Sequence, residues 1–227
     1  MGLFGKDDDG DIAARETEPE ESSFAARVSV ALVRKIVDVG IDGIGPLDPA
    51  AEVVQAARRD HDSVEAAINA VVRNHLKLAA AGGFATGVGG LITMPIALPA
   101  NVIGFYALAA RMAASIAELR GYDPDTDDTR TALMLTLLGA NADDILRRAG
   151  VVGGGTMGSI ALNRVPKAAA MVINKGVGFR VVTRLGSRTM ARLGRAVPLA
   201  GGVIGAGLDT FLMRRIADSV REEFPAI

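Results

Sequence analysis

Apolar residues recur at helical spacing along most of this chain, and no stretch alternates with the two-residue period of a β-strand. A first helix is expected from residues 22–23 to about Val39, and a short second helix from Pro49 to about Arg59. Ser63 can begin a third helix, whose apolar face includes His75. That histidine should therefore be buried or at the boundary of the core, with a backbone partner.

The next segment, Leu78 to Ala110, carries no charge in a chain that is 22% charged. Its glycines and its two prolines argue against one straight helix. We expect two helical segments with a bend at the sequence "ITMP" and an apex between Met94 and Pro99. The second segment should run from Pro99 to about Arg120 and stop at Gly121.

Further helices follow in the C-terminal half of the chain. The acid-rich "YDPDTDDTR" predicts a turn and a helix start, a basic helix is expected over about 177–195, and a last helix over about Pro198–Phe224. The tripeptide "VIG" occurs at Val102–Gly104 and again at Val203–Gly205. Two such proline-led segments could pack as a pseudo-symmetric pair, or the short match arises by chance.

Together these patterns predict an all-α fold: a compact multi-helix bundle containing a Gly/Pro-rich apolar helical hairpin. Residues 1–21 are acidic and apolar-poor, so a disordered tail is expected there. Residues 22–227 should form a single helical domain. Alanine, valine, leucine and glycine supply most of the apolar content, and such small residues let helices approach closely.

Composition argues against catalysis and metal binding. There is no cysteine and only two histidines, His61 and His75, so disulfides, zinc and histidine-rich metal sites are not expected. "GGGTMG" fits the dinucleotide pattern but lacks the preceding strand and the following acid, which favours an interhelix loop. We predict no enzyme, no catalytic residue, no metal and no cofactor. The acidic start lacks a signal peptide, so the protein is expected in the cytoplasm and not secreted.

The charges are separated along the sequence. From Ile145 to Leu208 there is no acid, yet bases are frequent, which suggests an anionic partner. The predicted basic helix carries an arginine stripe at spacings of four, four, four and three. Its members, the predicted membrane- or anion-binding residues, are Arg180, Arg184, Arg188, Arg192 and Arg195. A solvated face is the alternative, and with no tryptophan and two tyrosines, nucleic acid is not expected.

Two polar residues interrupt apolar helices, and both are candidate buried polar groups. Asn101 lies in the uncharged segment, and Asp209 is a lone acid that needs a partner, water or a helix end. The residues around the expected bend are candidates for insertion into lipid or for packing. They are Leu91, Ile92, Met94, Pro95, Ile96, Leu98, Pro99 and Phe105.

Three blocks in this order give a family resemblance. They are the segment Gly82–Asp123, the sequence "LLGANADDILRRAG", and the C-terminal segment Ala196–Phe224. Together they resemble the EcsC protein family over everything but the acidic tail. The resemblance implies a bacterial, helical, membrane-linked protein, connected with a membrane transport or secretion system, and supplies no reaction.

We therefore expect a protein peripherally associated with the cytoplasmic membrane, bound to anionic lipids by its arginine stripe and its apolar segments. A membrane transporter or another acidic protein is a further candidate partner. Two alternatives remain open at this point. One is a soluble helical module that binds a lipid-like ligand or a protein, and the other is an integral protein with a re-entrant hairpin.

Overall fold

The computed structural model describes residues 31–88, 90–138, 146, 156–162, 169 and 198–227. Within these ranges the chain is helical, and its only β-type pairing is an isolated bridge between Ile44 and Leu47. The predicted all-α class is confirmed. The predicted acidic tail and the predicted basic helix lie outside the described residues.

From residue 31 to the end of α4, short connections join one helix to the next. In order they are residues 31–42, α2 (Ala50–Asp60), α3 (Val64–Val88), α4 (Gly90–Leu119), α5 (Asp127–Leu138), α7 (Met157–Leu162) and α10 (Pro198–Glu223).

Local chemistry explains several of these boundaries. The backbone N–H of Ala66 donates to the Ser63 hydroxyl at 3.2 Å, which satisfies one of the free donors at the start of α3. Gly121 adopts φ +103°, a conformation that glycine tolerates well, directly after α4. Asp127 and Asp128 occupy the first turn of α5, where acids are favourable. These starts and stops agree with the sequence predictions.

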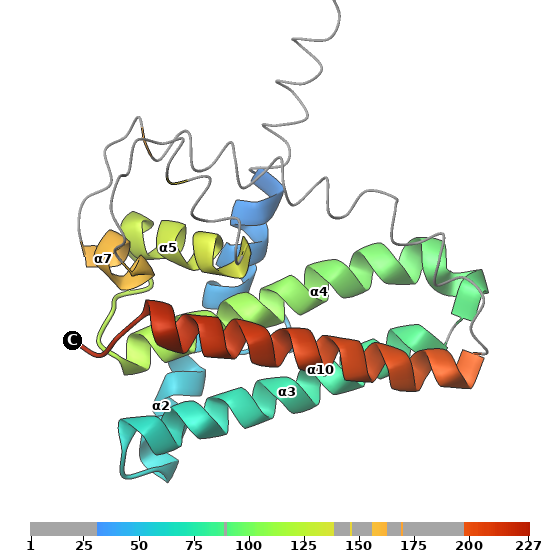
Figure 1. The fold of residues 1–227 in the computed structure, drawn as a ribbon, viewed down its shortest axis with the longest axis horizontal. Helices are drawn as coiled ribbons and strands as arrows, with labels where there is room; N and C mark the ends of the chain where they lie inside the picture. The colour runs from blue at the N-terminus through green and yellow to red at the C-terminus, as the bar shows by residue number, and fades with distance from the viewer. Residues whose placement is uncertain (1–30, 89, 139–145, 147–155, 163–168, 170–197) are drawn as a thin grey trace, which may run out of the picture.

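Three long helices, α3, α4 and α10, lie side by side along the long axis of the molecule (Figure 1). α4 and α10 run in the same direction, and α3 runs opposite to both. α10 packs chiefly against α3 and less extensively against α4. The predicted pairing of the segments that begin at Pro99 and Pro198 is therefore only a secondary contact.

At one end of these helices the remaining elements close a core. Residues 31–42, α2, α5 and α7 gather around the C-terminal half of α4 (Figure 1). The largest fully buried side chains of this core include Met112 and Ile116 of α4, Leu133 of α5, and Phe224, which directly follows α10. Burial of such side chains is the main favourable term in folding. We call this end of the molecule the body.

The C-terminus is fastened to the body by hydrogen bonds. The Arg120 guanidinium donates to the carbonyl oxygen of Phe224 at 2.7 Å, and the Tyr122 hydroxyl donates to that of Pro225 at 2.9 Å. The backbone N–H of Ile227 donates to the Arg120 carbonyl at 3.1 Å. The end of α10 is thus fixed, which fixes the orientation of the whole helix.

The hairpin between α3 and α4 differs from the prediction. α3 continues to Val88 and α4 already begins at Gly90, so the sequence "ITMP" and the predicted apex at Met94–Pro99 lie within α4 and not between the two helices, which corrects the prediction. The backbone of α4 remains helical through Pro95 and Pro99. The cost of a proline applies most fully to an isolated helix, and α4 as a whole packs against α3 and α10.

Candidate functional site

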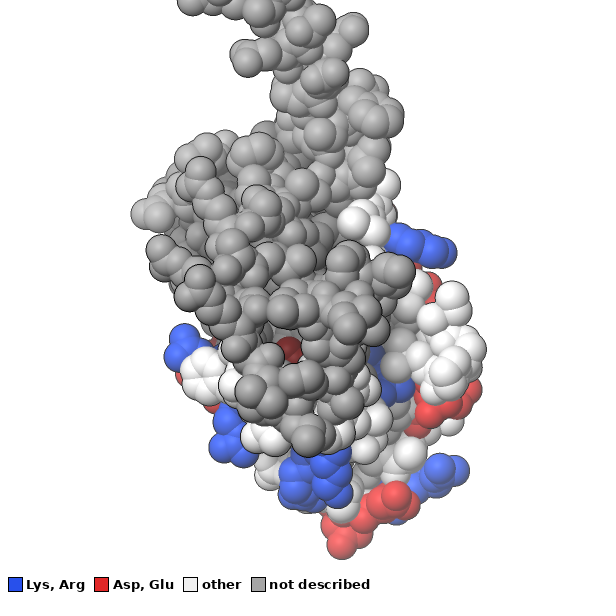
Figure 2. Space-filling view, turned by 90° about the vertical axis from the view of Figure 1, so that its right-hand side faces the viewer, with Lys and Arg blue, Asp and Glu red and all other residues white. Residues whose placement is uncertain are grey.

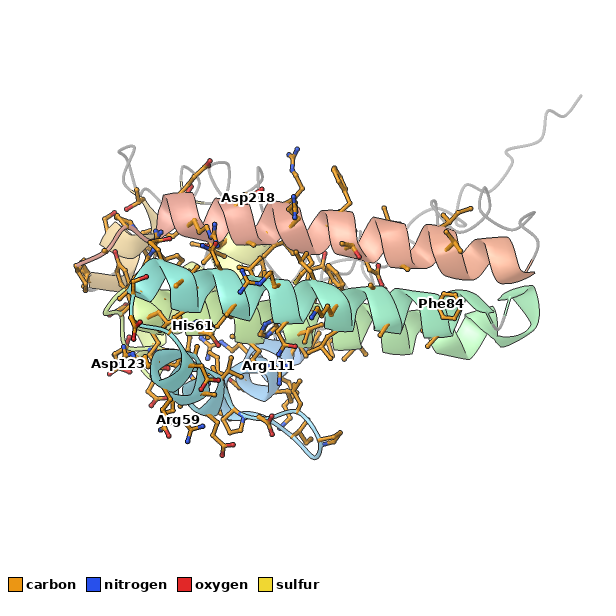
Figure 3. The ribbon with its side chains drawn as sticks, turned by 90° about the horizontal axis from the view of Figure 1, so that it is seen from below. Arg59, His61, Phe84, Arg111, Asp123 and Asp218 are labelled. Carbon is orange, nitrogen blue, oxygen red and sulfur yellow. The ribbon has the colours of Figure 1, made fainter. Side chains whose placement is uncertain are left out.

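The three long helices project beyond the body and form what we call the distal arm, residues 78–88, 90–110 and 198–213 (Figure 1). Asp209 is the only charged residue in this set. Figure 3 places Phe84 near the far end of α3, whereas Arg111 and Asp218 lie toward the body. The arm therefore differs sharply in charge from the rest of the molecule.

Glycines let α3 and α10 approach each other backbone to backbone in the distal arm. A Cβ added at Gly83 would lie 2.5 Å from the carbonyl oxygen of Gly205. One turn further out, a Cβ on Gly87 would collide with the carbonyl group of Gly201. Both helices thus use a glycine at every fourth position, a spacing that places small residues on one helix face and permits close packing.

Asn101 and Asp209, the two predicted buried polar residues, meet across this packing. The Asn101 side-chain amide of α4 donates to the Asp209 carboxylate of α10 at 3.3 Å, and both residues are half-buried. The carboxylate lies over Gly83 of α3, where any Cβ would stand 2.7 Å from its oxygen. Burial raises the pKa of Asp209, an effect that the bond from Asn101 opposes.

We expect Asn101→Ala to lower the free energy of unfolding by about 1 kcal/mol, because a half-buried carboxylate then loses its amide donor. Urea unfolding of Asn101→Ala, Asp209→Ala and the double variant forms a thermodynamic cycle. A coupling of about 0.5–1.5 kcal/mol is expected. Strictly additive effects would show that the contact contributes nothing.

The surface of the distal arm is unusually apolar for a water-facing surface. Eight of the twelve large apolar side chains that are exposed among the described residues belong to it. They are Leu78, Phe84, Ile103, Val203, Ile204, Leu208, Phe211 and Leu212. Val203 is 68% exposed and Phe211 is 58% exposed. Eight exposed apolar side chains on three neighbouring helices make the arm a candidate interaction site for a protein or a membrane.

The structure describes the other predicted site residues only in part. Seven of them lie on α4, in a part of the helix whose side chains are not among the described ones: Leu91, Ile92, Met94, Pro95, Ile96, Leu98 and Pro99. Phe105 is half-buried, and its ring packs edge-on against Tyr106. The arginine stripe from Arg180 to Arg195 lies outside the described residues.

Of the two positions predicted for His75, buried or at the boundary, the structure shows the buried one with a backbone partner, and it adds a side-chain partner that the sequence did not indicate. His75 is fully buried, and one ring nitrogen, Nδ1, lies 2.8 Å from the Val71 carbonyl, to which it can only donate. Its Nε2 then accepts from Arg111 Nε at 3.1 Å. Arg111, 4% exposed, also donates to the Asp48 carbonyl at 3.3 Å. The pair is a structural contact where α3 and α4 enter the body.

An open depression in the body gathers acids. Asp42, Glu118, Asp123 and Asp125 line it together with Arg58. Burial raises the pKa of Glu118, Arg58 opposes that rise, and Asp125 and Asp123 add to it. The Asp123 carboxylate already accepts a hydrogen bond from the backbone N–H of Asp125 at 2.9 Å, in the turn before α5. Among the described residues, no group of three or more His, Cys, Asp or Glu could hold a metal ion.

A comparison with protein-family models settles the family. The model of the EcsC protein family matches residues 51–224, well over half of the chain. The chain belongs to the EcsC protein family. No match was found among the curated proteins or among the solved structures.

In this EcsC protein, one described helical stretch is long and apolar enough to cross a membrane. It is Asn101–Leu119 of α4, and 67% of its most apolar window is buried inside the protein. A buried core helix meets the same criterion, so the stretch by itself is weak evidence for a span. The exposed apolar surface of the EcsC distal arm is the stronger observation.

Proposed function

We propose that this EcsC protein attaches to a membrane by placing its distal arm in lipid. The observation that carries the proposal is the combination of eight exposed large apolar side chains with a single charged residue over three helices. Burying an apolar side chain of this size is worth about 1.5–3 kcal/mol, so a few of them suffice for reversible attachment.

The one acid of the arm is compatible with this role. Asp209 is half-buried, accepts a hydrogen bond from Asn101 and lies over Gly83 at the contact with α3. A carboxyl group held between helices avoids most of the cost of exposing a charge to hydrocarbon. Within α3, α4 and α10 the interior backbone N–H and C=O groups pair with each other, as a lipid environment requires, and the unpaired groups of the arm are confined to the helix ends at its tip.

Attachment is tested by adding charge to the arm. Ile204→Glu with Leu208→Glu should reduce binding to neutral phosphatidylcholine vesicles by at least about a hundredfold, because two apolar contacts are lost and two charges enter lipid. Vesicle flotation of the purified protein measures the effect. Circular dichroism confirms that the variant remains folded.

Val64→Glu with Leu162→Glu is the matched control. Val64 and Leu162 are also exposed, at 47% and 58%, but lie outside the distal arm. This variant should float like the wild type. Equal losses in both variants would contradict the proposal. So would a wild-type protein that never floats, or one that forms dimers which Ile204→Glu with Leu208→Glu dissociates, since the apolar face would then be covered by a second copy.

A further inference from the structure

Four exposed basic residues stand where the distal arm joins the body: Arg73 and Lys77 of α3, and Arg214 and Arg215 of α10. We call them the basic collar. Lys77 directly precedes the arm segment of α3, and Arg214 directly follows that of α10. Figure 2 views the molecule from the end of the arm, and Lys and Arg side chains lie there beside Asp and Glu side chains at the edges of the described surface.

The two antiparallel helices place these charges at the same level. Gly83 lies against Gly205, and Gly87 against Gly201. The same register puts Lys77 beside Phe211 and Arg73 beside Arg215. The hydrogen bond from Arg221 to Asn69, 2.7 Å long, shows that the register continues into the body. The collar is therefore one band across both helices.

The exposed face of each helix changes character in the same order from tip to body. On α10 the exposed large side chains of the arm are apolar, from Val203 to Leu212, and they are followed by the basic Arg214 and Arg215 and then by the acidic Asp218. On α3, Phe84 and Leu78 give way to Lys77 and Arg73, and the first acid is Glu65. Apolar, basic and acidic bands follow one another on both helices.

The collar differs from the other bases of the long helices in having no partner within the described protein. Arg111 donates to His75 and Arg221 to Asn69, and Arg120, just after α4, pairs with Glu65 at 3.0 Å. None of the four collar residues forms an ion pair or a side-chain hydrogen bond with a described residue. Their charges are free to meet an external anion.

The distance from tip to collar matches one lipid leaflet. At 1.5 Å per residue, α3 is about 17 Å long from Lys77 to its end at Val88, and α10 about 24 Å from its start at Pro198 to Arg214. Half of a bilayer hydrocarbon core is about 15 Å. An arm inserted to this depth would bring the collar to the headgroups of the same leaflet.

We propose that the distal arm enters one leaflet only and that the basic collar selects anionic phospholipid headgroups at its surface. This inference rests on the proposed attachment and adds the lipid class, the depth and the residues. Each base near an anionic surface strengthens binding by about fivefold.

Two matched triple variants test the collar. Lys77→Gln, Arg214→Gln and Arg215→Gln neutralise one lysine and two arginines of the collar. Lys35→Gln, Arg34→Gln and Arg59→Gln neutralise the same residue types at exposed positions of the body. Flotation compares phosphatidylcholine vesicles with vesicles containing 30% phosphatidylglycerol. The wild type should prefer the anionic vesicles, the collar triple should lose about a hundredfold of that preference, and the body triple less than threefold.

The outcomes separate the two proposals. If the wild type binds both vesicle types equally, the collar inference fails and attachment stands. If the collar triple retains its anionic preference, the anion is bound elsewhere and the inference again fails alone. If the wild type binds neither vesicle, attachment itself fails.

Depth is measured with a tryptophan introduced into a chain that has none. Phe84→Trp should be quenched by phosphatidylcholine brominated along the acyl chain, and Val64→Trp, near the body end of the same helix, should not. Quenching of Phe84→Trp from only the headgroup region would overturn the one-leaflet insertion.

Discussion

Replacing Gly83 and Gly87 together with alanine should lower the free energy of unfolding by about 3 kcal/mol, because each new methyl group meets backbone that cannot move aside. At Gly83 the nearest obstacles are the carbonyl of Gly205, at 2.5 Å, and the Asp209 carboxylate, at 2.7 Å. At Gly87 they are the backbone atoms of Gly201 and Gly202. Overpacking of this kind usually outweighs the gain of up to about 1 kcal/mol that alanine brings to a helix.

Thermal unfolding followed by circular dichroism provides the measurement. A loss of about 3 kcal/mol corresponds to a decrease in Tm of roughly 6–12 °C for a chain of this size. The same double substitution should also weaken vesicle binding, since α10 and α3 could no longer present one continuous arm.

The chain offers a control with identical chemistry and the opposite expected sign. A Cβ added at Gly104 or Gly207 would meet nothing within 4 Å. Both glycines lie within helices of the same arm. Gly104→Ala with Gly207→Ala should therefore raise the free energy of unfolding by about 0.5–1 kcal/mol per site. If the Gly83/Gly87 and the Gly104/Gly207 double substitutions both change the free energy of unfolding in the same direction, the close approach of α3 and α10 does not stabilise the arm.

These glycines show how far the sequence could predict the fold. Their abundance correctly indicates close helix packing. Together with Pro95 and Pro99, however, they also favour a bend at "ITMP", which lies within α4. Helix propensity describes only the local destabilisation of a helix by each glycine. The close contact between Gly83 and Gly205, which offsets that destabilisation, joins residues more than a hundred positions apart in the sequence. The hairpin was therefore predicted correctly and its turn was placed too late, at Met94–Pro99 instead of between Val88 and Gly90.

The candidate site was predictable in kind but not in detail. The absence of charge from Leu78 to Ala110 singled out the arm, and Asp209 was recognised as needing a partner. That the partner is Asn101 depends on how three helices pack. The basic collar gave no local signal either, because Lys77 and Arg214 come together only through the antiparallel register of α3 and α10.

Acid should weaken this protein through His75. Its ring is buried between the Val71 carbonyl and Arg111, and burial is the main cause that lowers the pKa of His75 from 6.5 to about 4. Between these two values the unfolded chain binds a proton that the folded chain does not. The stability that the neutral ring confers is thus complete above about pH 6.5 and is lost progressively as the pH falls to about 4.

The expected loss is about 3 kcal/mol over that interval, because each pH unit between the two pKa values costs about 1.4 kcal/mol. Urea unfolding at several pH values between 4 and 8 measures it. Carboxylates also titrate in part of this range, so the quantity that matters is the difference between the wild type and His75→Gln. The glutamine side chain cannot take up the proton, and its carbonyl oxygen can still accept from Arg111.

Two further variants distinguish titration of His75 from general acid sensitivity. His61→Gln removes the other histidine, at the end of α2, and should leave the pH dependence of the wild type intact. His75→Leu should destabilise the protein by about 2–3 kcal/mol even at pH 8, because the buried Nε of Arg111 loses its acceptor. A His75→Gln protein whose stability falls as steeply as that of the wild type would mean that the pair is already open in solution and that Arg111 is hydrated there.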